Sequence, residues 1–128
     1  MVKVQALKEQ SMAMTSSPRY VLATSVKAGR DDDFETFMRD VVVPAEVQAR
    51  PHLAGMWQLM RPAADQPEGC TRAWLMFFQG PSALDDWNLE PLFDEAYGVD
   101  ASREHMQYFE DMVEGEQTVY ALDGDTEL

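Results

Sequence analysis

Cysteine, histidine and basic side chains are scarce in this chain of 128 residues, which holds one Cys, two His and ten Lys or Arg. The single cysteine, Cys70, excludes a disulfide within the chain and a cysteine-rich zinc site. Ten bases against 23 acids give a net charge of −13 at pH 7. Because phosphate binding needs clustered Lys and Arg, we expect neither nucleic acid nor an anionic membrane surface as a partner.

Long apolar runs are also missing. None approaches the roughly 20 residues of a membrane-spanning helix, and the first residues, MVKVQALKEQ, lack the apolar segment of a signal peptide. We therefore expect a cytoplasmic protein without a membrane partner. The acids are spread over 31–40, 85–100 and 110–127. We expect most of them on solvated helix faces, and an acidic recognition patch is the alternative.

Apolar periodicity predicts one folded domain between two tails. We expect a flexible tail over 1–18, a domain over 19–122 and an acidic tail over 123–128. Alternating apolar residues predict four strands, at 19–27, 55–61, 72–79 and 116–122. A proline-bearing loop over 62–69 joins the second strand to the third, so these two strands form a hairpin.

Two helical regions alternate with these strands. The first begins at a capping box formed by Asp32 and Glu35, and we expect Pro44 to kink or end it. The second begins at a capping box of Ser82 and Asp85 and is interrupted over 97–100, before a last helix over 101–113.

The resulting order, β-α-β-β-α-β, is that of the α+β ferredoxin-like fold, with a four-stranded antiparallel sheet. In this topology the first and third strands lie at the centre of the sheet. The third strand, RAWLMFFQ, is apolar on both faces, which predicts that both are covered. Helices from one chain cover only one face. We expect a second copy to cover the other, giving a homodimer.

At this point the sequence resembles the dimeric α+β barrel superfamily, which includes antibiotic-biosynthesis monooxygenases, polyketide cyclases and EthD-like proteins. EthD-like members often have W-Y-x-x-x-H-x-P in the first helix. The corresponding stretch here places Pro44 in register and Val42 at the histidine position. The cyclases tend to carry histidines around a His-Pro pair in the second helical region, where this chain has Glu90 before Pro91.

The resemblance implies a cavity between the helices and the sheet that holds a small hydrophobic or aromatic molecule. Many members act without metal or flavin, so no cofactor is expected. The implied function is a cofactor-independent enzyme for a small apolar or aromatic, polyketide-like substrate. It would act by proton transfer, as in cyclisation or isomerisation, or by oxygenation. A non-catalytic ligand-binding or homodimeric interaction module of the same fold is the alternative.

His105 is the candidate catalytic base, because a histidine beside an apolar helical stripe can titrate near neutral pH. The alternative for His105 is a surface position paired with an acid. Tyr20 or Tyr97 would supply a hydroxyl that orients the substrate. His52 is expected to belong to a loop, and no catalytic metal is expected from two such distant histidines.

Aromatic and arginine side chains are the candidate substrate contacts. Trp57 and Trp74 lie on strands that pair and could form one wall, with Tyr108 as a further aromatic contact. A place in the core or in a dimer interface is the alternative for all three. Arg39 would stabilise a developing enolate or phenolate, or else pair with the adjacent acid. Arg61 and Arg72, at the ends of the paired strands, are also considered for that role.

Overall fold

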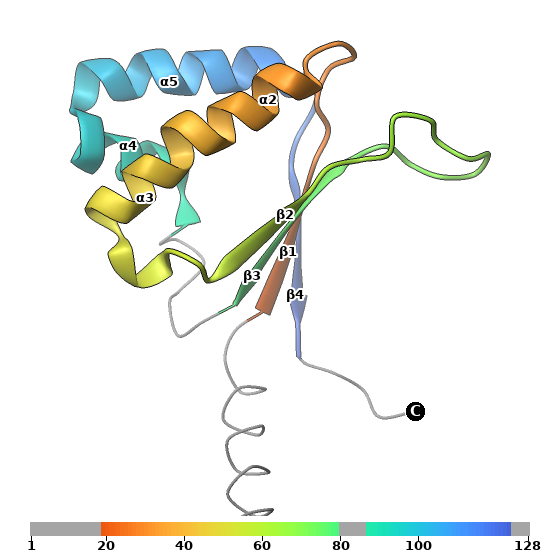
Figure 1. Ribbon diagram of the computed structural model, residues 1–128, viewed down its shortest axis with the longest axis horizontal. Helices are drawn as coiled ribbons and strands as arrows, with labels where there is room; N and C mark the ends of the chain where they lie inside the picture. The colour runs from red at the N-terminus through yellow and green to blue at the C-terminus, as the bar shows by residue number, and fades with distance from the viewer. Residues whose placement is uncertain (1–18, 80–86, 124–128) are drawn as a thin grey trace, which may run out of the picture.

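The computed structural model describes residues 19–79 and 87–123, which form a four-stranded antiparallel sheet with helices on one side (Figure 1). The strands are β1 (Arg19–Thr24), β2 (Trp57–Met60), β3 (Trp74–Gln79) and β4 (Thr118–Leu122). Their order is β2-β3-β1-β4, so the first and third strands are central. The ferredoxin-like βαββαβ prediction is confirmed. The proposed tail over 1–18, the capping box at Ser82 and all of the acidic tail except Asp123 lie outside the described residues.

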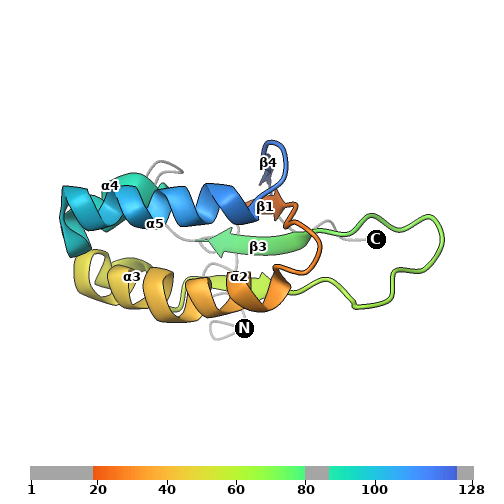
Figure 2. The ribbon, with the colours of Figure 1, turned by 90° about the horizontal axis from the view of Figure 1, so that it is seen from above.

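The helices form a single layer, in which the first helical region runs beside the second (Figure 2). The first region consists of α2 (Asp31–Phe37), a π-helical turn η1 (Met38–Val42), α3 (Val43–Ala49) and a short 3₁₀ turn η2 (Pro51–Leu53). The second consists of α4 (Leu89–Tyr97) and α5 (Val99–Met112). Gly98 separates α4 from α5 with a φ of 89°, a conformation that favours glycine. The predicted interruption is therefore present, but it is confined to Gly98, and α5 begins at Val99 rather than at 101.

The first helix begins one residue before the predicted capping box, and that box does not form. Arg30 is the N-cap of α2 and makes no side-chain capping bond. Asp32 and Glu35 instead bind Arg61, at 2.8 and 3.4 Å. Both carboxylates therefore pair with Arg61, which follows β2, instead of capping the helix. These ion pairs connect the sheet to α2.

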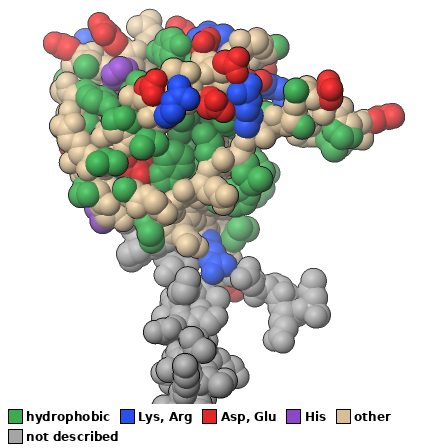
Figure 3. Space-filling view, viewed as in Figure 1, with side chains coloured by type: hydrophobic (Ala, Val, Ile, Leu, Met, Phe, Trp, Pro, Cys, Tyr) green, Lys and Arg blue, Asp and Glu red, His purple; other side chains and the backbone are tan. Residues whose placement is uncertain are grey.

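Asp31 makes a second connection between the sheet and α2. Its carboxylate pairs with Arg72 and accepts a hydrogen bond of 2.8 Å from Nε1 of Trp74. Arg72 also donates to the carbonyl of Val26, at 3.0 Å. Arg61 and Arg72, considered above as ligand-binding groups, are therefore engaged in joining strands to α2. Figure 3 shows basic and acidic side chains gathered over this helix.

Pro44 distorts the first helical region without ending it. A proline has no N–H to donate to the carbonyl four residues earlier, here that of Asp40. The chain responds with the wider turn η1, in which the N–H of Val43 bonds to the carbonyl of Met38. Pro44 then falls within the first turn of α3, where the missing donor costs little. The helical path continues to Ala49.

Aromatic side chains dominate the core between the helices and the sheet. Phe34 packs on Trp74 with ring centroids 4.9 Å apart, and Phe37 stacks on Phe109 at 6.0 Å. Phe93 is fully buried and meets Phe37 edge-on at 5.9 Å. Such ring pairs add roughly 0.5–1.5 kcal/mol each beyond the burial of their area.

The other face of the sheet is apolar and open. Val21, Phe77 and Tyr120 are cross-strand neighbours on that face, and Tyr120 is 54% exposed. Four of its large side chains are exposed: Met60, Phe77, Tyr120 and Leu122. We predicted that the third strand is covered on both faces. The described helices cover only the face of Trp74, Met76 and Phe78, because all of them lie on that side.

Candidate functional site

A cavity of about 810 Å³ lies between the sheet and the helices, which is the size of a small-molecule site. Its walls come from β1, β3 and β4 on one side and from α2, η1, α4 and α5 on the other. They are mostly apolar and include Leu22, Phe34, Met38, Met76, Phe78, Met106 and Phe109. The resemblance had implied a cavity in this place.

The polar residues of the cavity lie at its rim, where α4 begins and β4 approaches. They are Asn88, Glu90, Asp94, Glu116 and Gln117, and all five are exposed. Among the described residues that line the cavity, none is Lys or Arg. Carboxylates at the rim repel an anion, so the lining favours an uncharged or positively charged ligand over an anionic one.

Glu46 is a buried carboxyl group close to this cavity. Its side chain, from α3, is 5% exposed, and Oε1 accepts a hydrogen bond of 2.5 Å from Nε1 of Trp57 on β2. It lines a small void of about 20 Å³, which we call the inner chamber. Met38, Met76, Phe78, Trp87 and Leu89 line both the inner chamber and the large cavity. The inner chamber and the large cavity are therefore adjacent.

Burial raises the pKa of Glu46 from its usual 4.5 to about 7, and the hydrogen bond from Trp57 opposes this effect. A carboxyl with a pKa near 7 is present in both forms at neutral pH. It can then accept a proton in one step and return it in another. Glu46 therefore has the properties that sequence analysis sought in His105.

Sequence analysis missed Glu46 because it followed the apolar stripe only as far as Val42, before Pro44, which was expected to kink or end the helix. The stripe of Phe34, Phe37, Met38 and Val42 continues through the π turn to Ala45 and Glu46, both buried. A signal was present: four residues after Val42, the helical period predicts a position on the buried face, and a carboxylate occupies it.

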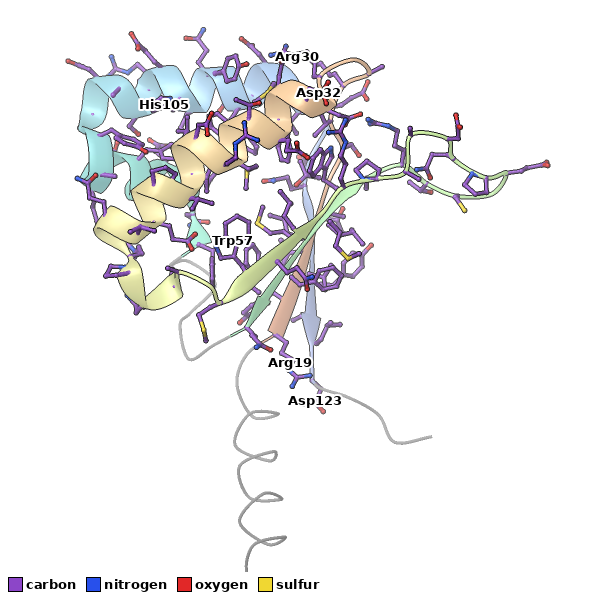
Figure 4. All side chains as sticks on the ribbon, viewed as in Figure 1. Arg19, Arg30, Asp32, Trp57, His105 and Asp123 are labelled. Atoms are coloured by element: carbon purple, nitrogen blue, oxygen red, sulfur yellow. The ribbon has the colours of Figure 1, made fainter. Side chains whose placement is uncertain are left out.

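His105 and Tyr97 lie together but outside the cavity lining. Their ring centroids are 5.2 Å apart, and His105 also meets Phe93 at 5.6 Å. Figure 4 shows His105 on α5, well away from Trp57 and the sheet. Met106 and Phe109 of α5 line the cavity. His105, the residue before Met106, instead contacts Phe93 and Tyr97 of α4. The catalytic role of His105 stays a prediction, and this position gives it no contact with a ligand in the cavity.

The hydroxyl of Tyr97 has a structural partner. It donates a hydrogen bond of 2.7 Å to the carbonyl of Val41 in η1, and burial raises its pKa. Tyr20 lies opposite Phe78 on the helix-facing side of the sheet, and Trp57 of β2 lies opposite Phe78 from the other side, but Tyr20 does not line the cavity. The orienting roles predicted for both tyrosines stay predictions.

The four predicted substrate contacts are divided among different places. Trp57 reaches the inner chamber. Trp74 is fully buried and bound to Asp31, in the core rather than in the cavity lining. Tyr108 is 43% exposed beneath the guanidinium of Arg30, and Arg39 is exposed and pairs with the adjacent acid at 3.2 Å. Trp57 is thus the member of this group closest to the cavity.

Neither metal-ligand clusters nor spanning helices occur in the described part of the chain. Within residues 19–79 and 87–123, no three His, Cys, Asp or Glu side chains converge as metal ligands would. In the same ranges no helix has the length and apolar character needed to cross a membrane.

No protein-family model and no curated protein matches the sequence. Among solved structures, a NIPSNAP-family protein of unknown function from Agrobacterium tumefaciens matches with a TM-score of 0.53 and 13% identity, covering 84% of this chain and 89% of that one. SnoaB, a cofactor-independent oxygenase from Streptomyces nogalater, matches with a TM-score of 0.46 and 13% identity, and the match covers 82% of this chain and 91% of SnoaB. An EthD-family protein from Bacillus halodurans matches with a TM-score of 0.43 and 12% identity, and the match covers 81% of this chain and 96% of that protein.

The match to the NIPSNAP-family structure concerns the fold, because 13% identity shows no more than that. Together with the observed strand order, it confirms the predicted resemblance at that level. The chain has the ferredoxin-like βαββαβ fold. The chemistry must be argued from the chain's own residues.

Proposed function

We propose that this protein is a cofactor-independent enzyme that binds a small apolar or aromatic substrate between its helices and its sheet. The observation that supports this is the apolar cavity of about 810 Å³. Binding there would remove apolar ligand surface from water, a gain of roughly 25 cal/mol per Å². Carboxylates at the rim, and the absence of Lys and Arg among the described lining residues, favour a substrate without negative charge.

The reaction proposed is proton transfer leading to cyclisation or isomerisation, with oxygenation as the other route. Both suit a substrate that forms an enolate or phenolate, because such an anion reacts without a bound metal or flavin. A water-poor apolar site holds the substrate in one orientation and strengthens hydrogen bonds to it.

A non-catalytic binding module is the second candidate. The position of His105 favours it, because the predicted base has no contact with the cavity. A module of this kind would bind the same ligand and release it unchanged.

Ligand binding can be tested with phenylnaphthylamine, an uncharged aromatic dye whose fluorescence rises in apolar sites. We expect saturable binding that Met106→Trp weakens at least tenfold, since Met106 lines the cavity and the larger indole would fill it. Gln107→Trp is the matched control, because Gln107 is the next residue of α5 and is exposed. Equal binding by both variants, or no binding by the parent protein, would refute the proposed site. If the dye binds as expected, native mass spectrometry of protein purified from its own host would identify the natural ligand.

We further propose that two copies pair through the open sheet face. Phe77 and Tyr120 expose apolar surface there, and a second sheet can pack on such a face. Such an arrangement buries the large side chains that the chain's own described helices leave open.

A further inference from the structure

We propose that Glu46 is the proton-transferring residue of this cavity, acting first as a base and then as an acid on an enolisable or phenolic substrate. This inference deepens the proposed function and rests on it. It starts from position, since Glu46 is a nearly fully buried carboxyl whose inner chamber shares five wall residues with the cavity.

The inner chamber gives the carboxyl access to a substrate. Its volume of about 20 Å³ is enough for one water molecule, and proton transfer through one water is within the reach of a general base. Met38 and Met76 are part of the shared wall. Methionine side chains are unbranched and change rotamer readily, so a ligand can displace them and approach the carboxyl directly.

Trp57 holds the carboxyl in place. Its indole N–H can only donate, so the hydrogen bond to Oε1 fixes one oxygen and leaves proton exchange to the other. Trp57 comes from β2 and Glu46 from α3, so the bond connects the sheet edge to the helix layer (Figure 4). A positioned, buried base of this kind loses little rotational freedom when it reacts.

Glu46 also has a route to solvent on its other side. A surface groove of about 380 Å³ lies between α3 and β2, and Glu46 and Trp57 both line it. The charged groups on this groove are Glu35 and Arg39, each already paired, with Arg61 and Asp40 respectively. The carboxyl therefore lies between the cavity and water, and can exchange its proton with solvent between turnovers.

The proposed step balances without a cofactor. The carboxylate takes a proton from an acidic C–H or O–H of the substrate, and the electron pair left behind moves onto the conjugated carbonyl or ring. The resulting enolate or phenolate forms its new bond within the substrate, and the protonated Glu46 returns the proton at another atom.

A carboxylate base in an apolar site can be assayed without the natural substrate by using nitrobenzisoxazole, an uncharged bicyclic probe. A base removes its ring C–H proton, the N–O bond breaks, the electron pair forms a nitrile, and a coloured cyano-nitrophenolate leaves. We expect saturable elimination by the full-length protein, with a rate that follows deprotonation of a single group near neutral pH. Glu46→Gln should lower kcat by roughly 100-fold, and its amide oxygen still accepts from Trp57, so the fold is kept.

Glu104→Gln is the matched control, because Glu104 is an exposed carboxylate on α5 that does not line the cavity. It should leave the rate unchanged. Displacement of phenylnaphthylamine by the probe measures binding separately from turnover. Binding with no loss of rate in Glu46→Gln would overturn the role of Glu46 and leave the proposed cavity intact. No binding by the parent protein would refute the cavity, and the role of Glu46 with it.

Discussion

The indole N–H of Trp57 donates to the carboxyl of Glu46 across 2.5 Å, joining an edge strand to the helix that follows the π turn. Among the described residues, the other neighbours of the Glu46 side chain in the inner chamber are apolar. The hydrogen bond ties the stability of the fold to the protonation state of a single buried group.

The free energy of unfolding should therefore depend on pH through Glu46. The folded-state pKa of about 7 lies above the usual 4.5. The carboxyl is protonated in both states at low pH, and as pH rises only the unfolded chain ionises until pH passes 7. Stability is thus fully present below the unfolded pKa and is lost as pH rises through the folded one. Relative to Glu46→Gln, the parent should lose roughly 2–3 kcal/mol between about pH 5 and about pH 8. Urea unfolding at several pH values measures this, and parallel curves for the two proteins would contradict it.

Removing the hydrogen bond should move the pKa of Glu46 further. The bond from Trp57 stabilises the carboxylate, so Trp57→Phe should raise the pKa above about 7 and destabilise the folded state at high pH by roughly 1–3 kcal/mol. Because the rate of probe elimination follows deprotonation of Glu46, the midpoint of its pH profile should move to higher pH in Trp57→Phe. Trp74→Phe is a useful comparison, because Trp74 is also buried but bonds to Asp31. Trp74→Phe should lower the free energy of unfolding without shifting the pH profile of elimination. An equal shift of the profile in both variants would disprove the assignment of that profile to Glu46.

Tyr97→Phe tests the connection between α4 and the π turn. The variant leaves the carbonyl of Val41 without its 2.7 Å hydrogen bond, and we expect a loss of about 1 kcal/mol in the free energy of unfolding. Tyr108→Phe is the control, because Tyr108 is 43% exposed and lies on α5, away from the open sheet face. If Tyr97 is instead an orienting catalytic group, Tyr97→Phe should lower kcat while leaving stability unchanged.

Phe77→Lys tests the proposed dimer. A lysine at the centre of the open face would place a charge in the interface, and loss of an anchoring side chain costs about 2 kcal/mol, or roughly 30-fold in Kd. Sedimentation over a range of concentrations should show a dimer for the parent and dissociation for the variant. Gln107→Lys, on the outer surface of α5, should remain dimeric. A parent protein that is monomeric at every concentration would contradict the proposal.

The fold was predictable because its strongest signals are local and mutually consistent. RAWLMFFQ is apolar on both faces, as a central strand should be, and Gly98 marks the break between α4 and α5. The ends of elements were predicted less well. Asp32 has the residue type of a helix cap, but Arg61, distant in sequence, binds it. A long-range ion pair of this kind leaves no trace in a local pattern.

The site was much less predictable than the fold. His105 was chosen because histidine, as a residue type, titrates near neutral pH. The pKa of Glu46 near 7 instead results from burial, which only the packed structure creates. The two arginines beside the paired strands had apolar neighbours in sequence, yet they bind carboxylates of α2 in space. Residue type predicts intrinsic chemistry, and the tertiary environment then changes it.

The π turn at Met38–Val42 also bears on how this chain tolerates changes in its length. A turn closed by bonds from residue i to i+5 contains one residue more than an α-helical turn, and the surplus is absorbed locally. Deleting one residue there would leave a helical path whose two halves keep their orientation, with Phe34 and Glu46 still facing inward and Pro44 as a kink between them. The same deletion within α5 would rotate Phe109 and Met112 away from the core by about 100°. The loss of one residue therefore disturbs the orientation of the core side chains less at η1 than along α5.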